Sequence, residues 1–161
     1  MRAAPRAVLV SAAGSSRGKT RWVEALVAEC VRRGLRVAVV KHHPHGRREE
    51  LGREKDTGRA RRAGAGVGVL AEPGALTLFV HERAAEALWH RALSLLAAEG
   101  AADVVLGEGF RAVAGAVRVW VGEGAPPPGD RIVVRVTGEE AADPARVREV
   151  CDAVLAAADP S

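Results

Sequence analysis

The strongest constraint on the fold lies near the start of the chain, where an apolar run over residues 7–13 meets a loop rich in glycine and serine. This loop fits the pattern G-x-x-x-x-G-K-[ST], with alanine in the first position. Its residues are Ala13-Gly14-Ser15-Ser16-Arg17-Gly18-Lys19-Thr20. Apolar residues at helical spacing follow over residues 20–33. A strand, a phosphate-binding loop and a helix in this order indicate an α/β fold.

Each residue type in the loop serves the binding of a nucleotide phosphate. Small residues let successive backbone N–H groups wrap around a phosphate, the lysine reaches the β and γ phosphates, and the hydroxyl binds Mg²⁺ at a helix N-terminus. We therefore expect Lys19 to act in catalysis and Thr20 to bind the metal. The expected phosphate-binding residues are Gly14, Ser15, Ser16, Arg17, Gly18, Lys19 and Thr20. The alternative is a glycine and serine turn that only caps a helix.

Beyond this loop, short apolar runs alternate with amphipathic stretches. We expect further strands over residues 36–40, 67–70, 75–80, 104–106, 117–121 and 132–136, and further helices over 57–63, 82–99 and 144–158. The helix between the first two strands implies that these strands pair in parallel. The chain has 161 residues, 48% of them hydrophobic, and we expect a single domain over residues 1–161. The expected fold is a three-layer, P-loop NTPase-like α/β domain with a mostly parallel sheet.

A phosphate loop needs an acid for its metal at the carboxyl end of a neighbouring strand, because parallel sheets bind their ligands there. The stretch Asp103-Val104-Val105-Leu106-Gly107-Glu108-Gly109 offers one. Glu108 follows the strand between two glycines, so we expect it to bind Mg²⁺ and to act in catalysis. Asp103 precedes the strand and is expected to be a cap or turn residue. Asp56 is the next candidate for the metal, and a solvated turn acid is the alternative for Glu108.

The positive charge of the chain is concentrated in residues 41–62. This segment carries eight lysine or arginine residues against four acids, which accounts for the whole formal net charge of +4. Its glycines and proline predict a loop over residues 42–56. We expect an anion site here for the phosphate of a cofactor or of a partner-bound nucleotide, and a merely solvated basic loop is the alternative. The expected anion-binding residues are Lys41, His42, Lys55 and Arg59, and Asp56 in the same segment is expected to take part in cofactor binding.

Composition excludes several function classes. With no tyrosine, two phenylalanines and three tryptophans, the chain lacks the stacking platform of a single-strand nucleic-acid binder. No apolar stretch reaches the roughly 18 to 20 residues of a transmembrane helix, so we expect a cytoplasmic protein without a membrane partner. Cys30 and Cys151 indicate core thiols, because no Cys-x-x-Cys pairing accompanies them. The histidines at 42, 43 and 45 are too close together, and interrupted by a proline, to favour zinc.

Four blocks of residues occur in order over residues 7–121. They are Gly14 to Thr20, then Lys41-His42-His43-Pro44-His45-Gly46, then Lys55-Asp56-Thr57 with Arg59 and Ala63-Gly64-Ala65, and finally Glu108-Gly109-Phe110-Arg111. Together these blocks resemble the molybdopterin-guanine dinucleotide biosynthesis protein B (MobB) family. The resemblance implies a homodimeric GTP-binding protein with weak GTPase activity, which helps a guanylyltransferase partner convert the molybdopterin cofactor to its guanine dinucleotide form. It also implies GTP and Mg²⁺ as cofactors, and molybdopterin or its guanine dinucleotide as a ligand.

The residues themselves leave other functions open. No Asn-Lys-x-Asp tetrapeptide is present, so the sequence does not choose between ATP and GTP. One alternative is a small-molecule kinase, in which the arginine-rich residues 47–62 act as a lid and an acceptor takes the γ-phosphate. Another is an adapter that binds nucleotide only to order its surface and does not turn it over.

Overall fold

The computed structural model describes residues 4–14, 17–42, 63–64, 67–80 and 84–159. The chain separates into two compact units, one built from Met1–His42 and Ala85–Ser161 and the other from His43–Ala84. The predicted loop over residues 42–56 and the predicted helix over 57–63 lie almost entirely outside the described residues. The expectation that residues 1–161 form one domain stays a prediction.

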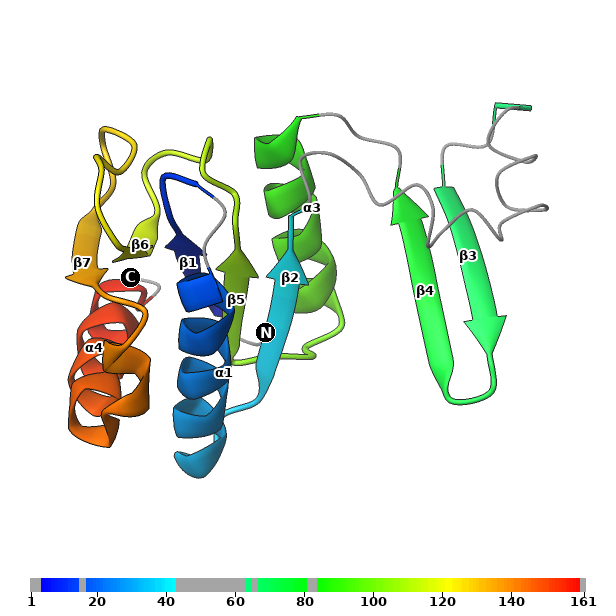
Figure 1. Ribbon diagram of the computed structural model, residues 1–161. Helices are drawn as coiled ribbons and strands as arrows, with labels where there is room; N and C mark the ends of the chain where they lie inside the picture. Colours follow the sequence, from blue (N-terminus) through cyan, green and yellow to red (C-terminus); the bar gives the residue numbers. More distant parts are fainter. Residues whose placement is uncertain (1–3, 15–16, 43–62, 65–66, 81–83, 160–161) are drawn as a thin grey trace. The chain divides into compact units, whose positions relative to one another are not determined.

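The larger unit is built around a five-stranded sheet with the strand order β2-β5-β1-β6-β7 (Figure 1). Its strands are β1 (Arg6–Ser11), β2 (Val37–Lys41), β5 (Val104–Glu108), β6 (Val117–Val121) and β7 (Ile132–Val136). Every neighbouring pair is parallel. Direct pairing of the first two strands is wrong, because β5 lies between β1 and β2 and pairs with both. The carboxyl end of β5 therefore lies beside the carboxyl ends of both strands.

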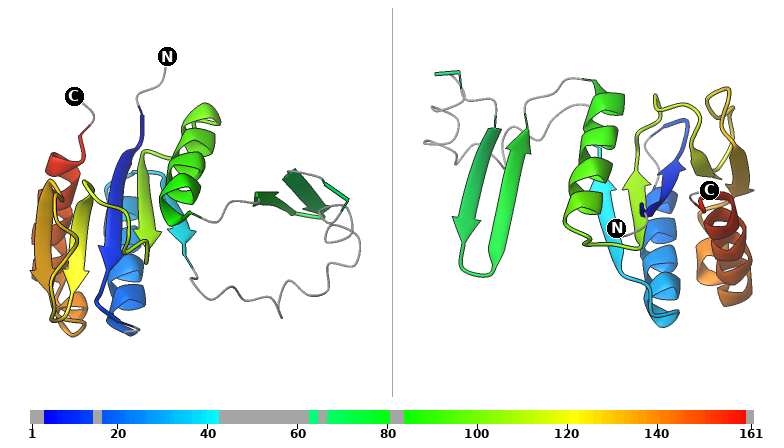
Figure 2. Two further views of the ribbon diagram at one scale, coloured as in Figure 1. Left: turned by 90° about the horizontal axis from the view of Figure 1, so that it is seen from above. Right: turned by 180° about the vertical axis from the view of Figure 1, so that it is seen from behind.

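Helices cover both faces of this sheet and make three layers (Figure 2). Helices α1 (Arg17–Arg32) and α4 (Pro144–Ala157) lie on one face, and α3 (Ala85–Ala98) lies on the other. Alternation along β1 decides which side chains meet which helices. Val8 and Val10 pack in the core that includes α1 and α4, whereas Leu9 packs with Trp89 of α3. The predicted three-layer α/β fold with a parallel sheet is confirmed.

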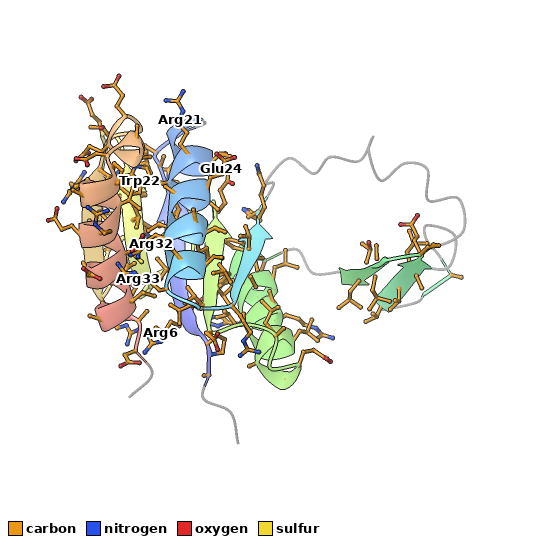
Figure 3. The ribbon with its side chains drawn as sticks, turned by 90° about the horizontal axis from the view of Figure 1, so that it is seen from below. Arg6, Arg21, Trp22, Glu24, Arg32 and Arg33 are labelled. Atoms are coloured by element: carbon orange, nitrogen blue, oxygen red, sulfur yellow. The ribbon has the colours of Figure 1, made fainter. Side chains whose placement is uncertain are left out.

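Helix α1 begins at Arg17, three residues before the predicted start, because the second half of the glycine and serine loop already has helical geometry. The helix ends near Gly34, whose φ of +77° suits a glycine. Figure 3 shows Arg33 near this end of α1, and its Nη1 atom lies 2.6 Å from Asp152 Oδ1 of α4. This ion pair ties the last turn of α1 to its neighbouring helix.

Helix α4 has a regular start that the sequence predicts well. The side chain of Asp143 accepts a hydrogen bond from Ala145 N at 2.9 Å, and Pro144 occupies the first turn. The short 3₁₀ helix η1 (Glu140–Ala142) before it was not predicted. Between α1 and α4, Cys30 and Cys151 are buried with their Sγ atoms 3.8 Å apart, which agrees with the prediction of core thiols.

The smaller unit contains an antiparallel hairpin of β3 (Val67–Glu72) and β4 (Ala75–Val80). Pro73 and Gly74 form its turn, as predicted, and Gly74 has a φ of +80°. Both strands expose large apolar side chains, which are Val67, Val69, Leu70, Leu76 and Leu78. Among the helices that the structure describes, none is both long and apolar enough to cross a membrane.

Candidate functional site

The phosphate-binding motif lies at the carboxyl end of β1, the central strand of the sheet. Gly14 and the residues from Gly18 onward are described there, whereas Ser15, Ser16 and the side chain of Arg17 lie outside the described residues. The motif therefore has the location that a nucleotide site requires in a parallel sheet.

Gly18 lets the loop pack closely against the segment that follows β7. A Cβ atom on Gly18 would lie 2.8 Å from Val121 Cγ1 and 2.9 Å from Gly138 Cα. The segment is held in place because Trp22 Nε1 of α1 donates to Thr137 O at 2.7 Å. The sequence motif explains this glycine by its approach to phosphate, but the sequence offers no signal for the contact with Gly138.

The ammonium group of Lys19 lies over the loop from which it projects. Lys19 Nζ donates to Gly14 O at 2.7 Å. Burial lowers the pKa of Lys19 from its ordinary value; the negative charge of Glu108 raises it in part, and the positive charge of Lys41 lowers it further. Lys19, Lys41 and Glu108 thus form one electrostatically coupled group at the carboxyl edge of the sheet.

Glu108 is the centre of this group. It ends β5 with its side chain only 10% exposed, and its Oε1 atom accepts a hydrogen bond from Thr20 Oγ1 at 3.1 Å. Lys41 Nζ, at the end of β2, lies 3.4 Å from the same oxygen. The structure therefore brings together four of the residues that the sequence selected, Lys19, Thr20, Lys41 and Glu108, although they come from three separate parts of the chain.

The chain turns sharply directly after Glu108. Gly109 has a φ of +94° and Phe110 a φ of +46°, the only positive φ at a non-glycine position among the described residues. A Cβ atom on Gly109 would lie 3.1 Å from His42 O, so a larger residue fits poorly there. Phe110 is buried, with its ring centroid 5.0 Å from that of His42 and 5.1 Å from that of Trp89. Packing on both sides holds this strained turn in place.

A buried polar network supports the same turn from the sheet. Arg118 of β6 is fully buried; its Nε donates to Asp130 Oδ2 at 2.7 Å, its Nη1 donates to Ser11 Oγ at 2.6 Å, and its Nη2 donates to Val113 O. Ser11 Oγ in turn donates to Gly109 O. This network could not be predicted from the sequence, because Arg118 and Asp130 belong to no recognisable motif.

A second arginine connects the turn to the phosphate-binding loop. Arg111 Nη1 donates to Ala13 O at 2.6 Å, at the first position of the loop. Arg111 belongs to the Glu-Gly-Phe-Arg block, but the sequence alone indicates no role for it. The bond links the end of β5 to the start of the loop, so the two halves of the site are held together.

The donor set around Glu108 fits Mg²⁺. A carboxylate and a hydroxyl from Thr20 are hard oxygen ligands, and Mg²⁺ typically takes one or two carboxylates together with phosphate oxygens and water. Across the described ranges no group of three or more histidine, cysteine or acidic side chains could hold a metal, so water and phosphate would complete the shell. Asp56, the other metal candidate, lies outside the described residues.

The remaining predicted binding residues have two outcomes. His42 lies directly after β2, where its backbone N–H donates to Glu108 O at 2.9 Å and its ring contacts Phe110. Lys55 and Arg59 lie outside the described residues, so the anion site expected over residues 41–62 stays a prediction.

A central parallel strand that leads through a G-K-T loop into a helix, with an acid at the end of the adjacent strand, defines a P-loop NTPase-like α/β protein. The family model of molybdopterin guanine dinucleotide synthesis protein B (MobB) matches residues 8–121. The chain therefore belongs to the MobB family, as its sequence blocks predict.

Solved structures agree with this family. A crystal structure of molybdopterin-guanine biosynthesis protein B is 23% identical, with a TM-score of 0.59, and the alignment covers 93% of this chain and 98% of that one. Bacillus subtilis MobB is 19% identical, with a TM-score of 0.57 and coverage of 97% and 99%. A MobB homologue from Bacillus stearothermophilus is 18% identical, with a TM-score of 0.57 and coverage of 94% and 99%. At these identities the likeness shows a shared fold. Comparison with curated protein sequences finds no match.

Proposed function

We propose that this protein binds GTP together with Mg²⁺ and hydrolyses it slowly, as an accessory protein to a guanylyltransferase that makes the guanine dinucleotide form of the molybdenum cofactor. The observation that carries the proposal is the meeting of Lys19, Thr20 and Glu108 at one edge of the sheet. Membership of a family described by molybdopterin guanine dinucleotide synthesis favours GTP over ATP.

Each residue of the site has a distinct role in this proposal. The Lys19 ammonium exchanges its bond with Gly14 O for the β and γ phosphates. Thr20 and Glu108 hold Mg²⁺, directly or through water, and the bound metal neutralises charge on the phosphates. Arg111 fixes the start of the loop through Ala13 O, so the backbone N–H groups keep one arrangement around the phosphate.

Residues 41–62 are proposed as the site for molybdopterin or its guanine dinucleotide. The support is the excess of four positive charges in this segment and its start at the carboxyl edge of the sheet, where Lys41 pairs with Glu108 in the strand register. Anionic cofactor phosphates are attracted to such a concentration of charge. Binding by this segment should therefore weaken as added salt screens its exposed charges.

Self-association as a homodimer is also part of the proposal. The hairpin of the smaller unit exposes five large apolar side chains, although a two-stranded hairpin is marginally stable without a covering surface. A second copy of the chain is the proposed cover. Sedimentation equilibrium should give twice the chain mass, and a Leu76→Glu variant should shift the equilibrium toward monomer, because Leu76 is 73% exposed and a charge there opposes an apolar contact.

Replacement of Lys19 tests the site. Lys19→Ala should weaken GTP binding about 10- to 150-fold, because a charge-assisted hydrogen bond is worth about 1.5 to 3 kcal/mol. Arg91→Ala on α3 is the matched control, since it removes an equal charge from an exposed position outside the cluster. Isothermal titration should give the parent affinity for Arg91→Ala and the reduced one for Lys19→Ala. Equal GTP affinity in the parent protein and Lys19→Ala would contradict the assignment of Lys19 to the nucleotide phosphates.

A reconstituted reaction with the guanylyltransferase separates the proposed function from its alternatives. We expect slow GTP hydrolysis, and a higher yield of guanine dinucleotide cofactor with the parent protein than with Lys19→Ala. A phosphorylated pterin product would instead identify a kinase. GTP binding without turnover above background, with and without the partner, would identify an adapter.

A further inference from the structure

Two groups from different elements, Thr20 of α1 and Lys41 of β2, share one oxygen of Glu108. Thr20 Oγ1 donates to Oε1 at 3.1 Å, and Lys41 Nζ lies 3.4 Å from the same atom. The side chain of Glu108 is 10% exposed and that of Lys41 is 46% exposed. A nearly buried carboxylate is thus neutralised by an ammonium group that remains in contact with solvent.

The sheet register makes this pairing direct. Lys41 and Glu108 are the last residues of β2 and β5 and are paired across the two parallel strands. The other lysine nearby, Lys19, donates to Gly14 O. Among these described groups, Lys41 is the cation that forms an ion pair with Glu108.

The pairing is loose by comparison with other ion pairs of the protein. Arg33 Nη1 lies 2.6 Å from Asp152 Oδ1, and Arg36 Nη2 lies 2.7 Å from Asp103 Oδ1. At 3.4 Å the Lys41 ammonium lies beyond close hydrogen-bond range of the carboxylate. Such a pair separates at little cost once another cation neutralises the carboxylate.

The presence of lysine rather than arginine at position 41 also favours a pair that can separate. The chain has three lysines among its 24 basic residues, so arginine is the usual cation of this sequence. An arginine would grip the carboxylate with a bidentate fork, whereas a lysine is a single charge on a flexible stem. A lysine at position 41 is therefore suited to an ion pair with Glu108 that has to dissociate.

A divalent cation at Glu108 would compete with Lys41, because both are positive and both seek the same oxygen. We propose that Lys41 is a positioning residue that stands in for the metal: it neutralises Glu108 until Mg²⁺ arrives with the nucleotide, and it is then released toward anionic groups at the same edge of the sheet. This inference rests on the metal role of Glu108 in the proposed function. It makes metal binding the event that frees a cation for phosphate.

The test is the affinity of the full chain for Mn²⁺ alone, measured from the electron paramagnetic resonance signal of free Mn²⁺. Lys41→Met should raise this affinity about three- to fivefold, because it removes a competing charge of modest pairing energy. Lys41→Arg should lower it about two- to threefold, because the fork grips Glu108 more firmly. Arg91→Met, an equal charge change on α3, should leave it unchanged. A Lys41→Met affinity equal to or below that of the parent would overturn the proposal.

A second titration checks where the released ammonium goes. With Mn²⁺ saturating, Lys41→Met should bind GTP about threefold more weakly than the parent, although it binds Mn²⁺ alone more tightly. A merely structural role would weaken both. Unchanged or tighter GTP binding by Lys41→Met would overturn the release of Lys41 toward phosphate.

The two titrations also separate failure of this inference from failure of the proposed function. If the parent binds GTP with Mn²⁺ and Lys41→Met does not raise the affinity for Mn²⁺, the inference fails and the proposed function stands. If the parent binds Mn²⁺ and responds to Lys41→Met but binds no GTP, the proposed function fails and the competition stands.

Discussion

Substitution of Gly18 tests how tightly the phosphate-binding loop is packed. Two physical effects predict changes of opposite sign in the free energy of unfolding of Gly18→Ala. Alanine in a helix is favoured over glycine by about 1 kcal/mol. The new Cβ, however, would lie 2.8 Å from Val121 Cγ1 and 2.9 Å from Gly138 Cα. The valine methyl can rotate away, but the Gly138 backbone is held by the neighbouring bond from Trp22 to Thr137 O.

The steric effect should win. Overpacking of a rigid site costs about 1 to 3 kcal/mol, and a clash with backbone falls at the upper end. After subtraction of the helix gain, Gly18→Ala should lose about 2 kcal/mol of unfolding free energy. For a chain of this size the melting temperature should then fall by about 4 to 8 °C.

Gly14→Ala is the matched control in the same loop. A Cβ on Gly14 meets nothing within 4 Å in the described structure, and its φ lies outside the left-handed range. This variant should keep or slightly raise the parent stability, because alanine restricts the unfolded chain. Urea unfolding of the three proteins, followed by circular dichroism, is the assay. A Gly18→Ala protein as stable as Gly14→Ala would refute the packing argument.

Two further predictions concern stability. Arg118→Met should cost about 3 to 5 kcal/mol in urea unfolding, because it leaves the carboxylate of Asp130 buried without its partner; a loss below about 1 kcal/mol would mean that the network contributes little. Hydrogen bonds from Arg32 and Arg33 lower the pKa of Glu29 to about 2 from an ordinary 4.5. Because the folded pKa is the lower one, the stabilisation is full above pH 4.5 and is lost as the pH falls toward 2. Glu29→Gln should flatten the decline of stability over that range, and an unchanged acid profile would contradict the pairing.

The parts of the site that could be predicted from the sequence are those formed by consecutive residues. The loop up to Thr20 is one such stretch, and the strand ending in Glu108 is another, because a run of apolar residues with a terminal acid is visible without a fold. The contact of Lys41 with Glu108 was out of reach, since it depends on β5 lying between β1 and β2. Local patterns indicate strands but do not fix their order in the sheet.

The contacts that support the site, those of Gly138 and Arg118, could not be predicted from the sequence for a similar reason. Gly138 supports the loop through backbone proximity alone, and a lone glycine in a sequence is equally typical of an ordinary turn. Arg118 is a polar residue in an apolar strand, a pattern that usually means a side chain facing solvent; here it is fully buried because Asp130 and Ser11 satisfy its donors. Such networks are decided by three-dimensional packing.

The central claim is that this loop and Glu108 form one Mg²⁺-dependent GTP site, and calorimetric titration of the purified protein with GTP tests it most directly. GTP should bind more tightly than ATP, and Mg²⁺ should strengthen GTP binding. In Glu108→Gln the strengthening by Mg²⁺ should be lost, while binding without metal is retained, because Lys19 and the loop are intact. Absence of GTP binding by the parent protein, or an unchanged effect of Mg²⁺ in Glu108→Gln, would contradict the assignment of the loop and Glu108 to one Mg²⁺-dependent GTP site.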